Sequence, residues 1–213
     1  MVVYKKALFV HVPKTGGSWV TEVLKRGGGK DFAYSHDIPQ HHRAYIFLRR
    51  LQPFCFVRHP LLIVCSLWKH WSGNPQCRVN NADEKLYKMW DKKAYGRILC
   101  DCIDERDVNR TIENFLTRQP LFITELLHKD TGHCEHVGRH ENLRSDLISI
   151  IEKINGEMPE SLRELILFEE PVNVSIGNDM SLDRSLVERF VKEETACSEF
   201  GYGVADLEEA GLV

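Results

Sequence analysis

The sequence lacks any apolar run that approaches the roughly 20 residues a membrane-spanning helix needs. Its first residues, Met1–Val12, also lack the apolar core of a signal peptide. We therefore expect a cytoplasmic protein with no membrane span. A luminal domain trimmed from a membrane-anchored protein would have the same composition.

The chain also lacks a strong net charge. Its 28 Lys and Arg residues and 31 Asp and Glu residues give a formal charge of -3. Such a balance provides no overall attraction to nucleic acid or to an anionic membrane, so we expect no nucleic-acid partner. Any site for a multiply charged anion must come from a local cluster of donors.

A paired cysteine framework is missing as well. The seven cysteines include no Cys-x-x-Cys pair. Cys100-Asp101-Cys102 and Cys134-Glu135-His136 could be drawn as metal ligands, but neither spacing matches a familiar zinc site. We expect reduced cysteines, several of them buried, and no metal.

The 213 residues contain no repeat, low-complexity tract or obvious linker, which predicts one domain over 1–213. Strand patterns alternate with helical ones, and this alternation predicts an α/β fold: a mostly parallel central sheet flanked by helices. The expected strands are 6–10, 31–35, 54–57 and 135–138, and the expected helices are 18–26, 83–93, 111–116, 186–194 and those beginning at Pro60 and near Leu143. Ser161 and Glu164 have the spacing of a capping box, and Asn142 is expected to cap the helix that follows it.

The first strand leads into Pro13-Lys14-Thr15-Gly16-Gly17-Ser18 and then into a helix. Glycines allow a tight turn in which successive backbone amides point at one anion, and the helix N-terminus adds a favourable dipole. Lys14 supplies a positive charge. The order differs from Gly-x-x-x-x-Gly-Lys-Ser/Thr, because this lysine precedes the glycines. The alternative is a tight turn with a solvated lysine.

A second motif is Phe54-Cys55-Phe56-Val57-Arg58-His59-Pro60, with Ser66 further along the next helix. Arg58 is expected at the carboxyl end of a buried strand, where open α/β sheets bind ligands. An arginine fork and a serine hydroxyl suit a second phosphate, distinct from the anion at the glycine loop. Taken separately, Arg58 could be a surface ion pair and Ser66 a helix filler.

These two motifs resemble the 5′-phosphosulfate loop and the 3′-phosphate motif of sulfotransferases that use 3′-phosphoadenosine 5′-phosphosulfate (PAPS). The segment Val137-Gly138-Arg139-His140-Glu141-Asn142-Leu143 is similar to a downstream segment of the same family, and Val172–Ser175 and Phe200–Tyr202 give weaker support. The resemblance spans almost the whole chain. One departure is His59, where Asn or Asp is common and would cap the next helix better. No motif aligns between Ser72 and Gly132, where an acceptor pocket would be expected to vary.

The resemblance implies a P-loop-like sulfotransferase fold and transfer of a sulfuryl group from PAPS to a hydroxyl or amine, with 3′-phosphoadenosine 5′-phosphate (PAP) as product and no metal. A carbohydrate or small-molecule hydroxyl is the favoured acceptor, and the oligomeric state is open. The residues expected to bind the nucleotide are Lys14, Thr15, Gly16, Gly17, Ser18, Trp19, Arg58 and Ser66.

Lys14 would also stabilise the leaving phosphate, and a histidine would act as general base. His36 is favoured because the resemblance places a histidine after the second strand, with His41 and His42 as rivals. Arg139 could approach the nucleotide or pair with Glu141, and the structural role is preferred. The alternatives are a P-loop phosphotransferase that needs magnesium and a triphosphate, and a non-catalytic nucleotide-binding protein.

Overall fold

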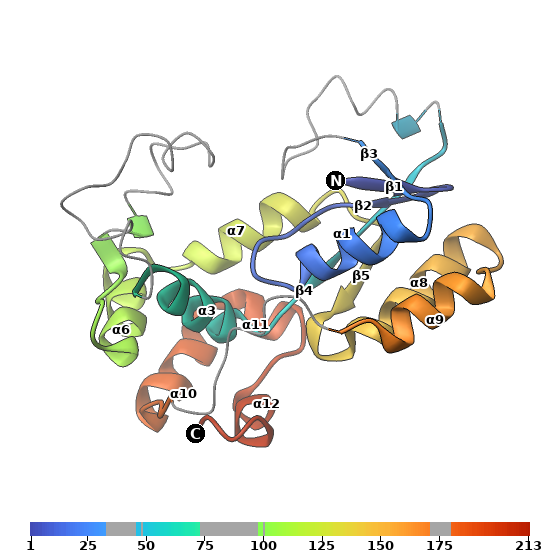
Figure 1. Ribbon diagram of the computed structural model, residues 1–213. Coiled ribbons are helices and arrows are strands. Elements are labelled where there is room, and N and C mark those ends of the chain that lie inside the picture. The colour runs from blue at the N-terminus through green and yellow to red at the C-terminus, as the bar shows by residue number, and fades with distance from the viewer. Residues whose placement is uncertain (33–45, 48, 73–97, 100, 171–179) are drawn as a thin grey trace. The chain divides into compact units, whose positions relative to one another are not determined.

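The computed structural model describes residues 1–32, 46–47, 49–72, 98–99, 101–170 and 180–213, shown as coloured ribbon in Figure 1. The chain divides into two compact units. The first unit comprises Met1–Arg58 and Leu126–Val174, and the second comprises His59–Glu125 and Ser175–Val213.

The described strands are β1 (Val2–Tyr4), β2 (Ala7–Phe9), β3 (Lys30–Asp31), β4 (Gln52–Val57) and β5 (His136–Arg139). The described helices are α1 (Gly17–Arg26), α3 (Pro60–Ser72), α6 (Val108–Arg118), α7 (Phe122–Thr131), η2 (His140–Asn142), α8 (Leu143–Asn155), α9 (Glu160–Phe168), α10 (Arg184–Glu193), α11 (Thr195–Glu199) and α12 (Val204–Glu209). None of the described helices is long and apolar enough to cross a membrane.

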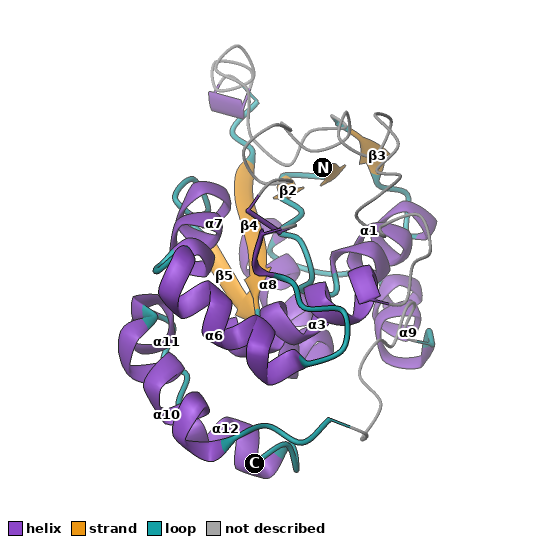
Figure 2. Ribbon diagram, turned by 90° about the vertical axis from the view of Figure 1, so that its left-hand side faces the viewer, coloured by secondary structure: helices purple, strands orange, loops and turns teal. Residues whose placement is uncertain are grey.

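The first unit contains a five-stranded sheet in the order β3-β1-β2-β4-β5. β4 pairs in parallel with β2 on one side and with β5 on the other, and the two neighbours β4 and β5 are visible in Figure 2. β1 is antiparallel to both β2 and β3. The sheet is therefore mixed, with its parallel part in the middle, and helices flank it.

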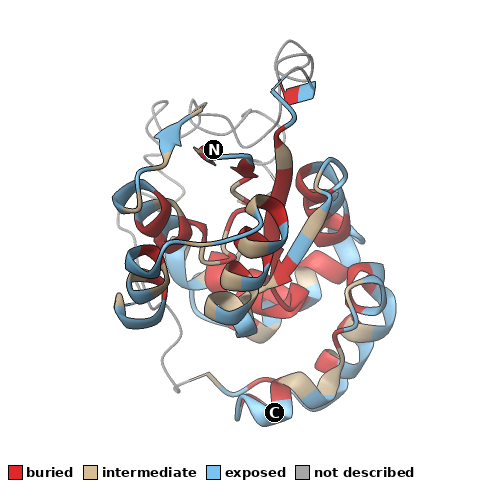
Figure 3. Ribbon diagram, turned by 90° about the vertical axis from the view of Figure 1, so that its right-hand side faces the viewer, coloured by how far each residue is buried: buried red, intermediate tan, exposed pale blue. Residues whose placement is uncertain are grey.

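The apolar sequence of β4 explains its central place. Its residues from Pro53 to Val57 are all buried, and the strand is coloured as buried over most of its length in Figure 3. A strand covered on both faces needs a continuous apolar run rather than an alternating one. Phe54 and Phe56 contact Phe9 of β2, and side chains of α1, α8 and α9 complete this core.

The glycine triplet ends α1 as expected. Gly28 has a φ of 97° and donates to the Lys25 carbonyl, while Gly29 donates to the Leu24 carbonyl. This is the Schellman arrangement, in which a left-handed residue satisfies the last carbonyls of the helix. Few residues other than glycine adopt that backbone conformation at low cost.

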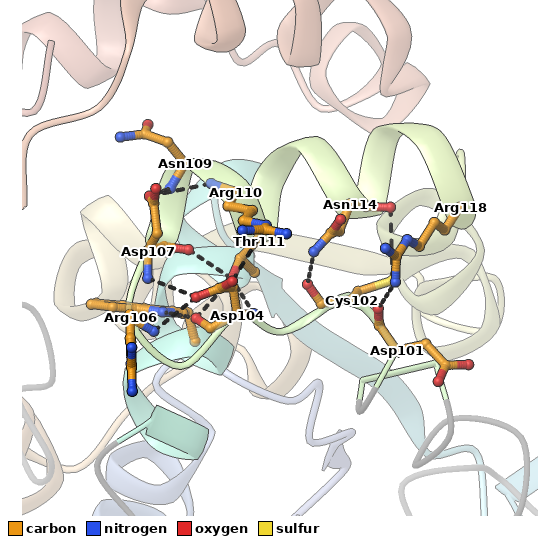
Figure 4. Close-up of polar contacts among 11 residues, drawn as sticks. Asp101, Cys102, Asp104, Arg106, Asp107, Asn109, Arg110, Thr111, Asn114 and Arg118 are labelled. Atoms are coloured by element: carbon orange, nitrogen blue, oxygen red, sulfur yellow. Dashed lines mark hydrogen bonds and ion pairs between the residues drawn. The ribbon is translucent and has the colours of Figure 1, made fainter. Parts of the chain in front are cut away.

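The second unit is built from helices. α6 and α10 pack together, and both contact α3. Asp107 begins α6 by accepting hydrogen bonds from the backbone amides of Asn109 and Arg110, and Asp104 accepts from the amides of Arg106 and Asp107 (Figure 4). These carboxylates satisfy amides that have no partner within the helix.

Most of the expected elements are confirmed: β2, β4, β5, α1, α3, α6, α8 and α10 lie at or within a few residues of their predicted positions. The prediction of a mostly parallel sheet holds only for its middle, because β1 and β3 add antiparallel edges. The expected helix 83–93 and most of the expected strand 31–35 lie outside the described residues.

Two capping predictions are wrong. Ser161 lies inside α9, which begins after Pro159 with no side-chain cap, so the spacing to Glu164 forms no capping box. Pro159 is the N-cap residue and has an extended backbone, with φ of -60° and ψ of 141°. Asn142 precedes α8 but its side chain makes no cap hydrogen bond. Asn142 is the last residue of the 3-10 turn η2, which leads directly into α8.

Candidate anion-binding site at the carboxyl edge of the sheet

Three parallel strands of the first unit end at one edge of the sheet. The register pairs Phe9 with Phe54 and Val57 with Arg139, so β2, β4 and β5 run in the same direction. The loop Pro13–Ser18 follows β2, Arg58 follows β4, and His140 follows β5. This edge is where open α/β sheets bind ligands, and it brings together a lysine, an arginine and a histidine.

The loop after β2 has the backbone of an anion cradle. Lys14 has a φ of 66° and Gly16 a φ of 81°, so left-handed residues alternate with other conformations. Thr15 is fully buried and donates its hydroxyl hydrogen to the Val12 carbonyl, at 2.9 Å. Alternating backbone handedness turns successive amides to one side, which is the geometry of anion-binding nests.

Helix α1 opens toward this loop without a side-chain cap. Gly16 is its N-cap residue and contributes no side chain, and no acidic residue lies in the first turn. The first amides of a helix have no acceptor within the helix, so those of Gly17 and Ser18 can bind an external anion. Ser18 is exposed, which leaves its hydroxyl accessible.

The two glycines are required by histidine rings that pack against them. A Cβ on Gly17 would lie 2.0 Å from Cδ2 of His11. A Cβ on Gly16 would lie 3.1 Å from Cδ2 of His140 and 2.9 Å from Cδ2 of Leu143. His11 itself stacks on Phe9, with ring centroids 6.1 Å apart. The loop thus contacts His11, which follows β2, and residues of η2 and α8.

Lys14 and Arg58 form a local cluster of positive charge. Nη1 of Arg58 lies 3.5 Å from the Lys14 carbonyl oxygen, and Arg58 is 9% exposed. Partial burial, and then the charge of Arg58, lower the pKa of Lys14 below its ordinary value. Among the described residues, no carboxylate forms an ion pair with Lys14. A bound anion would supply the missing negative charge.

Trp19 is placed in the core by α1. Its side chain is 3% exposed, and the guanidinium of Arg144 lies 5.3 Å from the indole centroid. Arg144 also donates to the carbonyls of Ile166 and Leu167 at the end of α9. The indole N–H of Trp19 has no acceptor among the described residues. The contact of Trp19 with a nucleotide stays a prediction.

Ser66 and His59 belong to the second unit. Ser66 is 3% exposed on α3, and its role with Arg58 at a 3′-phosphate stays a prediction. Nδ1 of His59 accepts a hydrogen bond from the Leu61 amide at 3.2 Å, and Nε2 lies 3.1 Å from the Gly203 carbonyl oxygen. This histidine does cap α3, and the acceptor role of Nδ1 leaves the proton on Nε2 for the Gly203 bond.

The predicted general base lies outside the described residues, as do its rivals: His36, His41 and His42. The backbone amide of Arg139 donates to Asp146 at 2.7 Å, which anchors the end of β5 to α8. In the part of the chain that the structure describes, no group of His, Cys, Asp and Glu side chains could hold a metal ion.

His11 and His140 contact the loop, and the sequence analysis gave neither of them a role. Both directly follow or flank strand ends, and that position was the available signal. Comparisons of the chain with protein-family models, curated proteins and solved structures found no match.

Proposed function

We propose that this protein is a sulfotransferase that moves a sulfuryl group from PAPS to an acceptor hydroxyl or amine. The observation that supports this most directly is the cluster at the carboxyl edge of the sheet. There an uncapped helix start, a loop with left-handed backbone at Lys14 and Gly16, and two partly buried cations meet. The motif resemblance then selects a phosphosulfate as the anion.

The chemistry of this proposal is an in-line displacement at sulfur. The acceptor oxygen or nitrogen attacks the sulfur, the bond between sulfur and the bridging phosphate oxygen breaks, and PAP leaves. Negative charge grows on that bridging oxygen, where Lys14 and the loop amides would stabilise it. The acceptor proton passes to a base, for which His36 remains the favoured residue. A carbohydrate or small-molecule hydroxyl is the favoured acceptor class, and no metal is required.

The first test is transfer of labelled sulfate from PAPS to a panel of carbohydrate, phenol, amine and peptide acceptors, with identification of the product. Binding of PAP is measured in parallel by calorimetry. A P-loop phosphotransferase would instead be stabilised by ATP with magnesium and not by PAP. A protein that binds PAP but labels no acceptor in the panel would support a non-catalytic nucleotide-binding role.

The role of Lys14 has its own test. Lys14→Ala should lower the turnover number by about 100-fold or more, because it removes a charge that acts on the leaving oxygen. Lys153→Ala is the matched control, since Lys153 is exposed on α8. Both variants should keep the wild-type thermal midpoint to within about 2 °C. Unchanged turnover in Lys14→Ala would remove the assigned role.

A further inference from the structure

His140 occupies the third strand end of the candidate site. β5 ends at Arg139, and His140 begins the 3-10 turn that leads into α8. Because β4 and β5 pair in parallel as far as Val57 and Arg139, His140 emerges at the same level of the sheet as Arg58. Each of the three parallel strands therefore delivers one basic side chain to this edge.

The imidazole of His140 lies against the anion loop. Its Cδ2 and Nε2 atoms would be 3.1 Å and 3.5 Å from a Cβ on Gly16, so the ring edge contacts the loop backbone. Within the described residues, neither ring nitrogen of His140 has a hydrogen-bond partner. A partly buried imidazole usually satisfies at least one nitrogen, so an available donor beside an anion loop suggests a ligand.

Burial and the nearby charge of Arg58 favour the neutral form of His140. Burial and then the positive charge of Arg58 lower its pKa from 6.5 to about 4, while Glu141 acts in the opposite direction. Other charged or titratable groups on adjacent elements include Arg139 at the end of β5, Lys14 and His11 beside the loop, and Arg144 and Asp146 in the first turn of α8. Asp146 accepts from the Arg139 amide, and Arg144 binds carbonyls at the end of α9.

We propose that His140 is a third binding residue of the loop, which takes up a proton when the doubly negative phosphosulfate group occupies the site. This inference rests on the proposed function, because that function supplies the anion. The proton comes from solvent and no covalent bond changes. A dianion beside the ring outweighs the repulsion from Arg58, and the imidazolium can then donate a charge-assisted hydrogen bond. The competing explanation is a neutral ring that only packs on Gly16.

The experiment uses adenosine 5′-phosphosulfate, which carries both charges of the phosphosulfate but lacks the 3′-phosphate, a group that itself titrates near neutral pH. Its affinity for the full chain is measured by calorimetry between about pH 5 and pH 8, in pairs of buffers with different ionisation enthalpies. The dependence of the heat on the buffer reports the protons taken up. PAP binding is measured alongside to show that the nucleotide site works.

The variants are His140→Gln, which keeps a neutral polar side chain of similar size, and the control His136→Gln. His136 lies at the opposite end of β5 and contacts Gln52, 3.3 Å away. In the wild type and in His136→Gln, affinity should increase by up to about tenfold for each pH unit that the pH falls, with net proton uptake. In His140→Gln the pH dependence should disappear, and the affinity near pH 5 should be at least about tenfold weaker than that of the wild type.

Binding of the probe to the wild type without proton uptake would overturn the inference alone, even if His140→Gln failed to fold. Retention of the pH dependence in a folded His140→Gln variant would also overturn it. Absence of binding by either nucleotide would instead overturn the proposed function and, with it, the basis of the inference.

Discussion

Gly17→Ala should have two opposing effects on stability: a gain in helix propensity and a steric overlap at the loop. Gly17 is the first residue of α1, where alanine would stabilise the helix by up to about 1 kcal/mol relative to glycine. The new Cβ, however, would lie 2.0 Å, 2.4 Å and 2.8 Å from three atoms of the His11 ring. These separations are far below ordinary van der Waals contact, so the ring must move.

Movement of the His11 ring has a cost that outweighs the propensity gain. The ring stacks on Phe9 with an interplanar angle of 23°, and a stacked pair contributes about 0.5–1.5 kcal/mol. Overpacking elsewhere in a core typically costs about 1–3 kcal/mol. We therefore expect Gly17→Ala to lower the free energy of unfolding by about 1–2 kcal/mol, measured by urea denaturation.

A double-mutant cycle isolates the cause. In a His11→Ala background the overlap is gone, so Gly17→Ala should become neutral or stabilising, with a coupling energy of about 1–2 kcal/mol. Gly156→Ala serves as the control: its φ is 84° and nothing lies within 4 Å of its Cβ position. Its cost comes from the left-handed backbone and should be equal in both backgrounds. Equal destabilisation by Gly17→Ala with and without His11 would refute the steric argument.

Three further predictions concern Glu194, Cys197 and Arg144. Burial raises the pKa of Glu194 above its ordinary 4.5. The free energy of unfolding of the wild type should therefore fall, relative to that of Glu194→Gln, as the pH rises from about 4.5 through the folded pKa. A constant difference between the two proteins across a pH series of denaturation curves would contradict this. Burial raises the pKa of Cys197 to about 12, which leaves roughly one thiolate in ten thousand at about pH 8. Iodoacetamide should therefore label Cys197 slowly until urea unfolds the chain, and rapid native labelling seen by peptide mass spectrometry would refute its burial. Arg144→Lys should lower the free energy of unfolding by about 2 kcal/mol, because a lysine lacks the planar fork whose two nitrogens reach the carbonyls of Ile166, Leu167 and Glu169. An unchanged denaturation midpoint would show that this fork contributes little.

The elements that sequence reasoning located correctly carry strong local signals. The triplet Gly27-Gly28-Gly29 ends α1, and Pro60 begins α3. The apolar run of β4 predicts a strand covered on both faces, and this is what the sheet order requires. In each case the residue type alone restricts the backbone conformation or the solvent exposure, so the element can be predicted without knowledge of its tertiary contacts.

β1 was missed because its hairpin lacks the usual turn residues. Tyr4 pairs with Ala7, so only Lys5 and Lys6 form the turn, and Lys5 takes a φ of 52°. Hairpin turns of this length normally use Gly or Asn to reach a positive φ. The pairing in the sheet provides the stabilisation that the local sequence does not, and this pairing cannot be seen in a short sequence window.

Hydrogen bonds between residues far apart in the sequence could not be predicted either. Glu194 is 4% exposed and accepts from the backbone amide of Thr124 at 2.7 Å, across a sequence separation of 70 residues. Glu194 thus provides the acceptor for an amide in the first turn of α7. Nothing in the sequence near Thr124 indicates this partner. His59 is similar: its contact with the Gly203 carbonyl depends on how the second unit folds, so its capping role was underestimated.

A chain with a net charge of -3 can still gather positive charge locally. The parallel register places Lys14, Arg58 and His140 at one edge, although they are far apart in the sequence. Their proximity has an electrostatic cost: burial, and then the charge of Arg58, lower the pKa of both Lys14 and His140. In the proposed function, a bound anion offsets that cost, and its second negative charge lets His140 take up a proton and donate a charge-assisted hydrogen bond. Under the proposed function, we expect selectivity for a doubly charged group over a singly charged one, because only the second charge brings His140 into its protonated form beside Lys14 and Arg58.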